Sequence, residues 1–261
     1  LNVPLTKETV WLECTSQQSP MGYLSYDCSD KNVLLVTEAG GKIVRTPKYS
    51  PADNFQNRKI NVVMTDQGAA EIDIEADYGY AQYENVFPLV LAEPVEQRKY
   101  VMRSLSIPNM QLIKASYVQA DRNQPRLKEQ IVIKSSQLTS MGADKIFLTL
   151  NLLNRRESVP AKANARQTNF SIDFAYHDID EITYMLPAGL KVEFLPKDVS
   201  ITSEFGTYQM KVLQKGNQIV YTRTQIMNSK EYSAEKYNEL VDFYKKVYQA
   251  DKLKGILAKG I

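Results

Sequence analysis

The sequence predicts a mainly β protein, an antiparallel β-sandwich with a C-terminal amphipathic helix and a small N-terminal β segment. Apolar and polar residues alternate with a period of two in many separate stretches, as in strands with one solvent-facing side. Clusters of Gly, Pro, Asn and Asp separate these stretches, as turns do. Strands do not alternate regularly with helices, which disfavours a Rossmann or TIM architecture. The 261 residues allow one large all-β domain or two smaller domains.

The first 47 residues predict a small β segment. A strand over 9–15, an apolar run over 32–37 and a hairpin through Gly40-Gly41 into 42–46 precede a proline-containing connector at 46–54. About 50 residues bury too little surface to form a stable core alone. We therefore place a domain boundary at residue 47. Residues 1–47 either pack on the larger region or are the remnant of a domain whose other part lies elsewhere.

The alternating pattern in residues 48–261 predicts an accessory β-sandwich domain with the C-terminal helix. The clearest strand covers 71–77, where Ile72, Ile74 and Ala76 share one face. Similar apolar rows are Ile146/Leu148/Leu150/Leu152, Phe170/Ile172/Phe174/Tyr176, Ile182/Tyr184/Leu186, Leu190/Val192/Phe194, Tyr208/Met210/Val212 and Ile219/Tyr221. Turns are expected at 66–68, 187–189 and 215–217, and the polar stretch 154–168 predicts a long surface loop.

Two helices are expected among these strands. Pro94 suits the first position of a short helix over about 94–105. The second begins after Ser233, whose hydroxyl can cap a free backbone N–H, and it ends near Lys252 and Lys254. Its apolar stripe follows helical spacing and consists of Tyr237, Leu240, Val241, Tyr244, Val247 and Tyr248. We expect this stripe to dock against the sheet.

Composition argues against several functions. Lys and Arg number 32 against 30 Asp and Glu, and this near balance argues against a nucleic-acid surface. One His and two Cys leave too few ligands for the usual structural zinc site. The acidic cluster 178–181 lacks the calcium-binding loop pattern, and Gly40-Gly41 lacks the context of a phosphate loop. We predict no metal, no cofactor and, without an apolar run of about 18 residues, no membrane span.

The strand 9–15 carries the first candidate site. In this strand Cys14 shares the apolar face with Val10 and Leu12, so we expect it to be buried. Trp11 and Glu13 lie on the opposite face, and Trp11 is a candidate binding residue. A carboxylate beside an indole can orient a catalytic His, as the third member of a nucleophile–base–orienter set does. The alternative for Glu13 is a solvated carboxylate at a strand edge.

Cys28 and the single His, His177, form a second candidate site. Cys28 lies in a polar loop and is a reactive thiol, a disulfide partner of Cys14, or an ordinary loop cysteine. We favour free thiols, because Cys14 is expected to face a core and Cys28 a loop. His177 ends the strand 170–177 beside Asp178, and nearby carboxylates would raise its pKa. A Cys–His dyad with either cysteine competes with a simple surface His. The many tyrosines are a further candidate, as a sugar- or peptide-binding platform, although most are expected in the core.

The stretch Trp11-Leu-Glu-Cys-Thr-Ser-Gln resembles the strand that closes the catalytic core of bacterial transglutaminase-like cysteine peptidases. In that family a Cys nucleophile starts a helix, a His follows on a strand, and an acidic residue, usually Asp, follows on the next strand. Glu13 stands at the acidic position. Looser matches resemble the β-sandwich after the core of large exported members, and they are Gly40-Gly-Lys, Thr46-Pro, Asp53-Asn, Gly68, Leu186-Pro-Ala-Gly, Leu195-Pro, Phe205-Gly-Thr-Tyr and 232–237.

The resemblance implies the C-terminal portion of such an enzyme. The family's Cys and His would precede Leu1, and neither Cys14 nor His177 aligns with them. The partner would be an upstream catalytic domain of the same polypeptide, the substrate a peptide amide, and the location periplasmic or at the cell envelope. The chain alone would then be inactive. Two alternatives remain: a non-enzymatic β-sandwich that binds glycan or peptide, or scaffolds other chains, at the cell envelope, and an independent hydrolase using Cys28 and His177.

Overall fold

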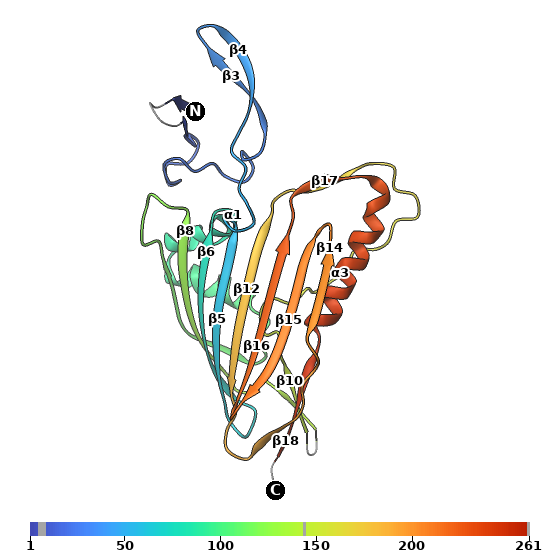
Figure 1. The fold of residues 1–261 in the computed structure, drawn as a ribbon. Coiled ribbons are helices and arrows are strands. Elements are labelled where there is room, and N and C mark those ends of the chain that lie inside the picture. The colour runs from blue at the N-terminus through green and yellow to red at the C-terminus, as the bar shows by residue number, and fades with distance from the viewer. Residues whose placement is uncertain (5–8, 143–144, 260–261) are drawn as a thin grey trace.

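A computed structural model of the chain describes residues 1–4, 9–142 and 145–259. Its largest element is an eight-stranded sheet in the order β14-β15-β16-β12-β5-β6-β8-β7 (Figure 1). The strands are β5 Phe55–Met64, β6 Ala70–Gly79, β7 Met110–Val118, β8 Arg126–Ser135, β12 Tyr176–Met185, β14 Val199–Ser203, β15 Gly206–Lys215 and β16 Gln218–Met227. Neighbours pair antiparallel except β12 and β5, which are parallel and join two antiparallel halves. The predicted mainly β fold is confirmed, with a mixed sheet at its centre.

A second layer covers one face of this sheet. It contains a smaller sheet in the order β13-β18-β10-β9 and the helix α3, Tyr237–Asp251, which follows a 3₁₀ turn at Ala234–Lys236. The strands of the smaller sheet are β9 Ser140–Met141, β10 Lys145–Thr149, β13 Leu190–Phe194 and β18 Lys254–Lys259. Side chains from both layers form one buried cluster, including Ile60 and Ile72 of the large sheet, Leu148 and Leu257 of the small sheet, and Val247 of α3.

The same face is completed at the β7 end by short helices. These are α1, Ala81–Val86, a 3₁₀ turn at Phe87–Val90, and α2, Pro94–Ser104. Pro94 stands at the start of α2, so the predicted helix over 94–105 is confirmed. Tyr83 and Val86 of α1 pack with sheet residues such as Tyr78, Tyr117 and Leu127 in a second buried cluster.

The opposite face of the large sheet is polar, which explains the alternation in the sequence. Ile72, Ile74 and Ala76 are buried as predicted, whereas Glu71 and Glu75, at alternate positions of the same strand, are exposed. Not every predicted row is fully buried: Phe194 of β13 is 51% exposed. No helix among the described residues has the length and apolarity needed to cross a membrane.

The N-terminal segment lies at one end of the large sheet (Figure 1). Its strands are β1 Asn2–Pro4 and β2 Thr9–Trp11, which pair with each other, and β3 Asn32–Thr37 and β4 Gly40–Arg45, which form the predicted hairpin. The prediction of a strand over 9–15 is wrong beyond Trp11. Leu12 to Thr15 form no strand. The Leu12 N–H donates to the Leu1 carbonyl (2.7 Å), and the Leu12 carbonyl accepts from the Leu1 ammonium group (2.9 Å).

Two further predictions are corrected. The row 170–177 is not one strand: β11, Phe170–Ile172, pairs with β17, Lys230–Tyr232, and β12 begins only at Tyr176. Ser233 does precede the C-terminal helical segment, but its side chain makes no capping hydrogen bond. The helix itself packs as predicted, with Leu240, Val241 and Val247 buried.

Candidate functional site

Glu13 and Trp11, the residues of the predicted catalytic strand, lie at and just after the end of β2. Both side chains are half-buried. Glu13 Oε1 accepts hydrogen bonds from the Thr15 backbone N–H (2.9 Å) and the Thr15 hydroxyl (2.6 Å). These bonds from Thr15 lower the pKa of Glu13, and the nearby Cys28 thiol acts in the same direction. Glu13 is therefore a carboxylate at neutral pH. Its catalytic role stays a prediction.

The two cysteines are free and exposed. For Cys28 this agrees with the predicted loop position and the predicted free thiol. For Cys14 the prediction of a buried side chain is wrong. The strand ends at Trp11, so the alternation that would have turned Cys14 inward does not continue, and its thiol lies 3.7 Å from the Leu12 carbonyl oxygen.

His177 is the second residue of β12, and its backbone N–H donates to the Asn54 carbonyl (3.1 Å). Desolvation lowers the pKa of its half-buried imidazole. The expectation that adjacent carboxylates raise this pKa is wrong, because Asp178, the next residue, points to the opposite face of the sheet. In the described part of the chain no hydrogen bond joins His177 to Cys14 or Cys28, so the structure does not assemble a dyad.

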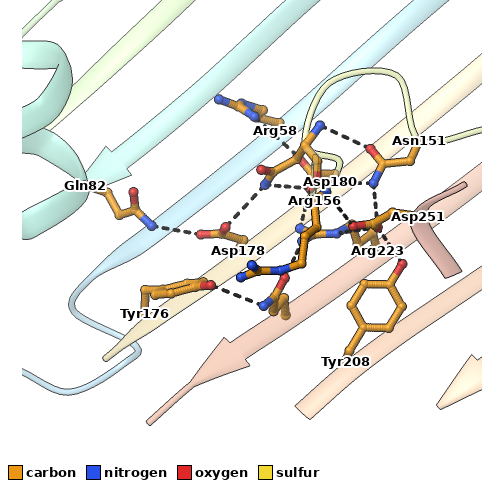
Figure 2. Close-up of polar contacts among 12 residues, drawn as sticks. Arg58, Gln82, Asn151, Arg156, Tyr176, Asp178, Asp180, Tyr208, Arg223 and Asp251 are labelled. Carbon is orange, nitrogen blue, oxygen red and sulfur yellow. Dashed lines mark hydrogen bonds and ion pairs between the residues drawn. The ribbon is translucent and has the colours of Figure 1, made fainter. Parts of the chain in front are cut away.

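Asp178 and Asp180 of the acidic cluster 178–181 belong to a buried polar network between the sheet and α3, whereas Glu181 is exposed (Figure 2). Its centre is Arg223 of β16, 3% exposed. Arg223 Nη1 donates to Asp180 Oδ2 (3.1 Å), Nε donates to Asp251 Oδ1 (3.3 Å), and Nη2 donates to the Gln225 side chain. Asp180, Asp251 and Arg223 are all removed from solvent. Buried charges are costly unless they are paired and hydrogen-bonded, and here the guanidinium bonds directly to both carboxylates.

Asp251, the last residue of α3, receives further donors. Asn151 Nδ2 and the Tyr208 hydroxyl each donate to Asp251 Oδ1 at 2.8 Å, and the Arg156 backbone N–H donates to Oδ2 at 2.9 Å. The end of α3 is thereby tied to β15, β16 and the loop after β10 (Figure 2). The network thus connects the two layers of the fold.

Asp178 completes the network at the α1 side. Gln82 Nε2 donates to its Oδ1 (2.9 Å) and Asn154 Nδ2 to its Oδ2 (3.2 Å). Burial nevertheless raises the pKa of Asp178 to about 6. Arg58 Nη1 lies 3.9 Å from Asp180 Oδ1 and adds a second cation. Because these groups chiefly satisfy one another, the network is structural, and the described residues contain no group of three or more His, Cys, Asp or Glu that could hold a metal ion.

The sequence contained a signal for this network that our predictions missed. Asp178 and Asp180 occur in phase with Ile182 and Tyr184, whose side chains were predicted to face the core. Charged residues in phase with a buried row imply buried partners. The identity of Arg223 and Asp251 as those partners depends on strand pairing over long separations in the chain.

A tyrosine cluster joins the N-terminal segment to the sandwich. Tyr23 is 4% exposed and stacks on Tyr49, with ring centroids 5.5 Å apart. Its hydroxyl donates to Glu84 of α1, and the Tyr26 backbone N–H donates to the same oxygen (2.9 Å). Burial raises the pKa of both Glu84 and Tyr23. A shared carboxylate therefore fixes the loop 20–27 against α1.

A hollow of about 460 Å³ opens beside this cluster. It is lined by the aromatic residues Tyr49, Phe55 and Tyr80 and by the polar residues Gln124 and Arg126, among others. Tyr80 has backbone angles φ 47° and ψ −117°, in a region that bulky residues rarely occupy. The size falls within the range of small-molecule sites.

Parts of the chain are similar to a protein family of unknown function and to a solved structure. The model of DUF3858, a domain of unknown function with a solved structure, matches residues 144–257, which run from β10 to β18. Among curated proteins there is no match. A crystal structure described as that of a "putative protease" from Parabacteroides distasonis is similar at 17% identity and a TM-score of 0.33. That similarity covers 38% of this chain and 19% of the other, so it takes in only about a fifth of the longer protein.

Proposed function

We propose that the chain is the accessory portion of a transglutaminase-like cysteine peptidase. Residues 1–47 belong with the catalytic core of that enzyme, and residues 48–261 form a β-sandwich that supports it. The Cys nucleophile and the His base come from a catalytic domain of the same polypeptide. Glu13 orients the His. The polypeptide acts on peptide amides outside the cytoplasm, at the cell envelope.

The observation that carries this proposal is the exposed apolar face of the β3–β4 hairpin. Leu34, Val36 and Ile43 are 63%, 76% and 65% exposed, and Leu34 and Ile43 stand opposite each other in the register. A two-stranded hairpin is marginally stable by itself. Contiguous exposed apolar side chains typically mark a contact surface. A catalytic domain packed on this face would bury all three side chains.

The geometry of Glu13 suits the role of orienter. Both hydrogen bonds from Thr15 go to Oε1, which holds the carboxylate in place and ionised. Oε2 can then accept a hydrogen bond from a His Nδ1–H and stabilise the imidazolium that forms during acyl transfer. In such an enzyme a thiolate attacks the amide carbonyl, and the imidazolium gives its proton to the leaving amine.

The test uses the polypeptide encoded by the complete gene. We expect Glu13→Gln to lower kcat for hydrolysis of a peptide amide roughly a thousandfold or more, by analogy with the third residue of other triads. Glu235→Gln, the same change at an exposed carboxylate elsewhere in the chain, should leave kcat unchanged. Equal activity of the Glu13→Gln enzyme, or a gene that encodes no Cys and His before Leu1, would remove the catalytic role of Glu13.

The isolated chain provides the complementary measurement. We expect no amide hydrolysis, and we expect Cys14 and Cys28 to react with iodoacetamide at the rate of ordinary thiols. Rapid labelling of Cys28 that disappears in His177→Ala would contradict the proposal and favour an independent hydrolase. Replacement of Leu34 by Asp in the complete polypeptide tests the docking face, because it should loosen the hairpin contact while the sandwich stays folded.

A further inference from the structure

We propose that the hollow beside Tyr80 is a binding site for a neutral saccharide. This site is distinct from Glu13 and does not depend on the peptidase proposal. It lies between the loop 21–23, the connector after β4 with the start of β5, the end of β6, and the loop that joins β7 to β8, so four separate parts of the chain converge on it. Such convergence of loops at one end of a sheet is a common position for ligand sites.

The backbone at the end of β6 is built to place the Tyr80 ring. Tyr80 holds a positive φ that its side chain disfavours, and its N–H donates to the Pro125 carbonyl (2.9 Å). A Cβ at the preceding residue, Gly79, would lie 2.4 Å from the Phe55 ring and 2.7 Å from the Asp53 carbonyl oxygen. Gly79 lets the backbone pass close to the Phe55 ring, and the positive φ of Tyr80 turns the next side chain. Together they place the rings of Tyr80 and Phe55 in the lining of the same hollow. Strain of this kind is retained where a function needs the geometry.

The aromatic lining offers flat apolar surfaces. Tyr80 packs edge-on against Tyr49, with centroids 4.7 Å apart, and edge-on against Tyr23, at 5.4 Å. These contacts fix the tyrosine rings before any ligand arrives, which reduces the entropy lost on binding. Aromatic side chains combine an apolar face with a polar tip, as recognition of a sugar ring requires.

The polar lining offers donors and acceptors without net charge. Arg126 is paired with Asp77 through its Nε (2.9 Å) and Nη2, so its charge is neutralised. Asn123 and Gln124 carry primary amides, each both donor and acceptor, and within the described residues neither amide side chain is bonded to another group. Sugar hydroxyls are likewise both donors and acceptors. A proline-rich peptide, the other usual ligand of aromatic grooves, presents mainly carbonyl acceptors and matches this lining less well.

The test is titration of the folded chain with chitotriose, maltotriose and cellotriose, and with a proline-rich decapeptide, followed by saturation-transfer NMR and calorimetry. We expect saturable binding of at least one trisaccharide. Tyr80→Gly removes the ring but keeps a residue suited to positive φ, so the chain should remain folded. The Tyr80→Gly variant should bind the trisaccharide about threefold to tenfold more weakly than the parent chain. Tyr80→Phe, which retains the ring, should keep most of the affinity.

Tyr248→Ala provides the matched control, because it removes a half-buried tyrosine on α3, away from the hollow. It should leave saccharide binding unchanged. Three results would overturn the proposal: no trisaccharide binds, the peptide alone binds, or affinity is the same in the Tyr80→Gly variant as in the parent chain.

Discussion

Asp251 is a buried carboxylate that depends on several hydrogen-bond donors. It is fully buried, at 0% exposure, and it accepts hydrogen bonds from Asn151, Tyr208, Arg223 and the Arg156 backbone. A buried carboxylate without such partners would be very costly. With them it ties the end of α3 to the sheet, and the stability of the network depends on keeping all of its members together.

Removal of Arg223 should therefore be severe. In Arg223→Met the side-chain volume is nearly kept, but Asp180 and Asp251 lose the cation that faces them. Breaking a buried ion pair by removing one partner costs about 3–5 kcal/mol. We expect a drop of that order in the free energy of unfolding in urea. As a control, Lys145→Met breaks the half-exposed pair with Glu193 and should cost less than about 1 kcal/mol.

Asp178 should make stability fall as the pH rises. Its folded-state pKa of about 6 lies above the ordinary value of about 3.9, so the folded state binds its proton more tightly than the unfolded state does. Its contribution is fully present below pH 4 and is lost as the pH passes 6, by about 2–3 kcal/mol in total. Urea unfolding at pH 4 to 7 should show this loss in the parent chain and a smaller one in Asp178→Asn.

The difference between those two proteins is the informative quantity. Burial also raises the pKa of Glu84 and Glu129, and desolvation lowers that of His177, so these groups contribute to both curves. Their contributions cancel in the difference. Identical curves for the two proteins would show that Asp178 is ionised normally in the folded chain.

Residue-level prediction from sequence succeeded where local alternation decides burial. It placed Ile72, Ile74 and Ala76 inside, and the free Cys28 in a loop. It failed for Cys14 because the period-two rule holds only while the strand continues, and β2 ends at Trp11. The phase of Asp178 and Asp180 with Ile182 and Tyr184 signalled buried carboxylates, but the identity of their partner could not be predicted, because Arg223 lies 43 residues from Asp180 in the chain.

At the scale of elements, β18 shows the same limit. It follows α3 after only two residues and lies between β13 and β10 in the small sheet. Both neighbours are distant in sequence, since Leu257 pairs with Val192 on one side and with Ile146 on the other. Six residues carry too weak a local pattern to predict a strand, and tertiary pairing decides the outcome. The two predicted helices, whose signals are local, are confirmed as α2 and α3, whereas the six-residue helix α1 was not predicted.

Leu257→Ala tests how much β18 contributes. Leu257 is fully buried in the main core, so we expect a loss of about 2–5 kcal/mol in the free energy of unfolding. Lys259→Ala, on an exposed position of the same strand, should change stability by less than about 0.5 kcal/mol. A small effect of Leu257→Ala would mean that the small sheet can detach without loss of the large one.

At the scale of the molecule, residues 1–47 and the sandwich are joined at few points. The buried contact centres on Tyr23, which lies among Tyr49, Tyr80 and Tyr83 and bonds to Glu84. The β3–β4 hairpin extends beyond this contact (Figure 1). Its apolar side chains Leu34, Val36 and Ile43 are exposed. If a domain boundary lies at residue 47, residues 1–47 can unfold locally while the core of residues 48–261 stays intact.

Tyr23→Ala is the sharpest test of that boundary. The change deletes a buried ring and leaves the Glu84 carboxylate with one donor fewer, so loosening of residues 9–47 should be strongly favoured. We expect faster amide hydrogen exchange in that segment and unchanged protection in β5, β6, β12 and β16. Tyr248→Ala on α3 should leave exchange in residues 9–47 as it is. If Tyr23→Ala instead weakens protection throughout the eight-stranded sheet, the two parts fold as one cooperative unit, and the hairpin would then be an extension of the sandwich rather than part of a separate catalytic core.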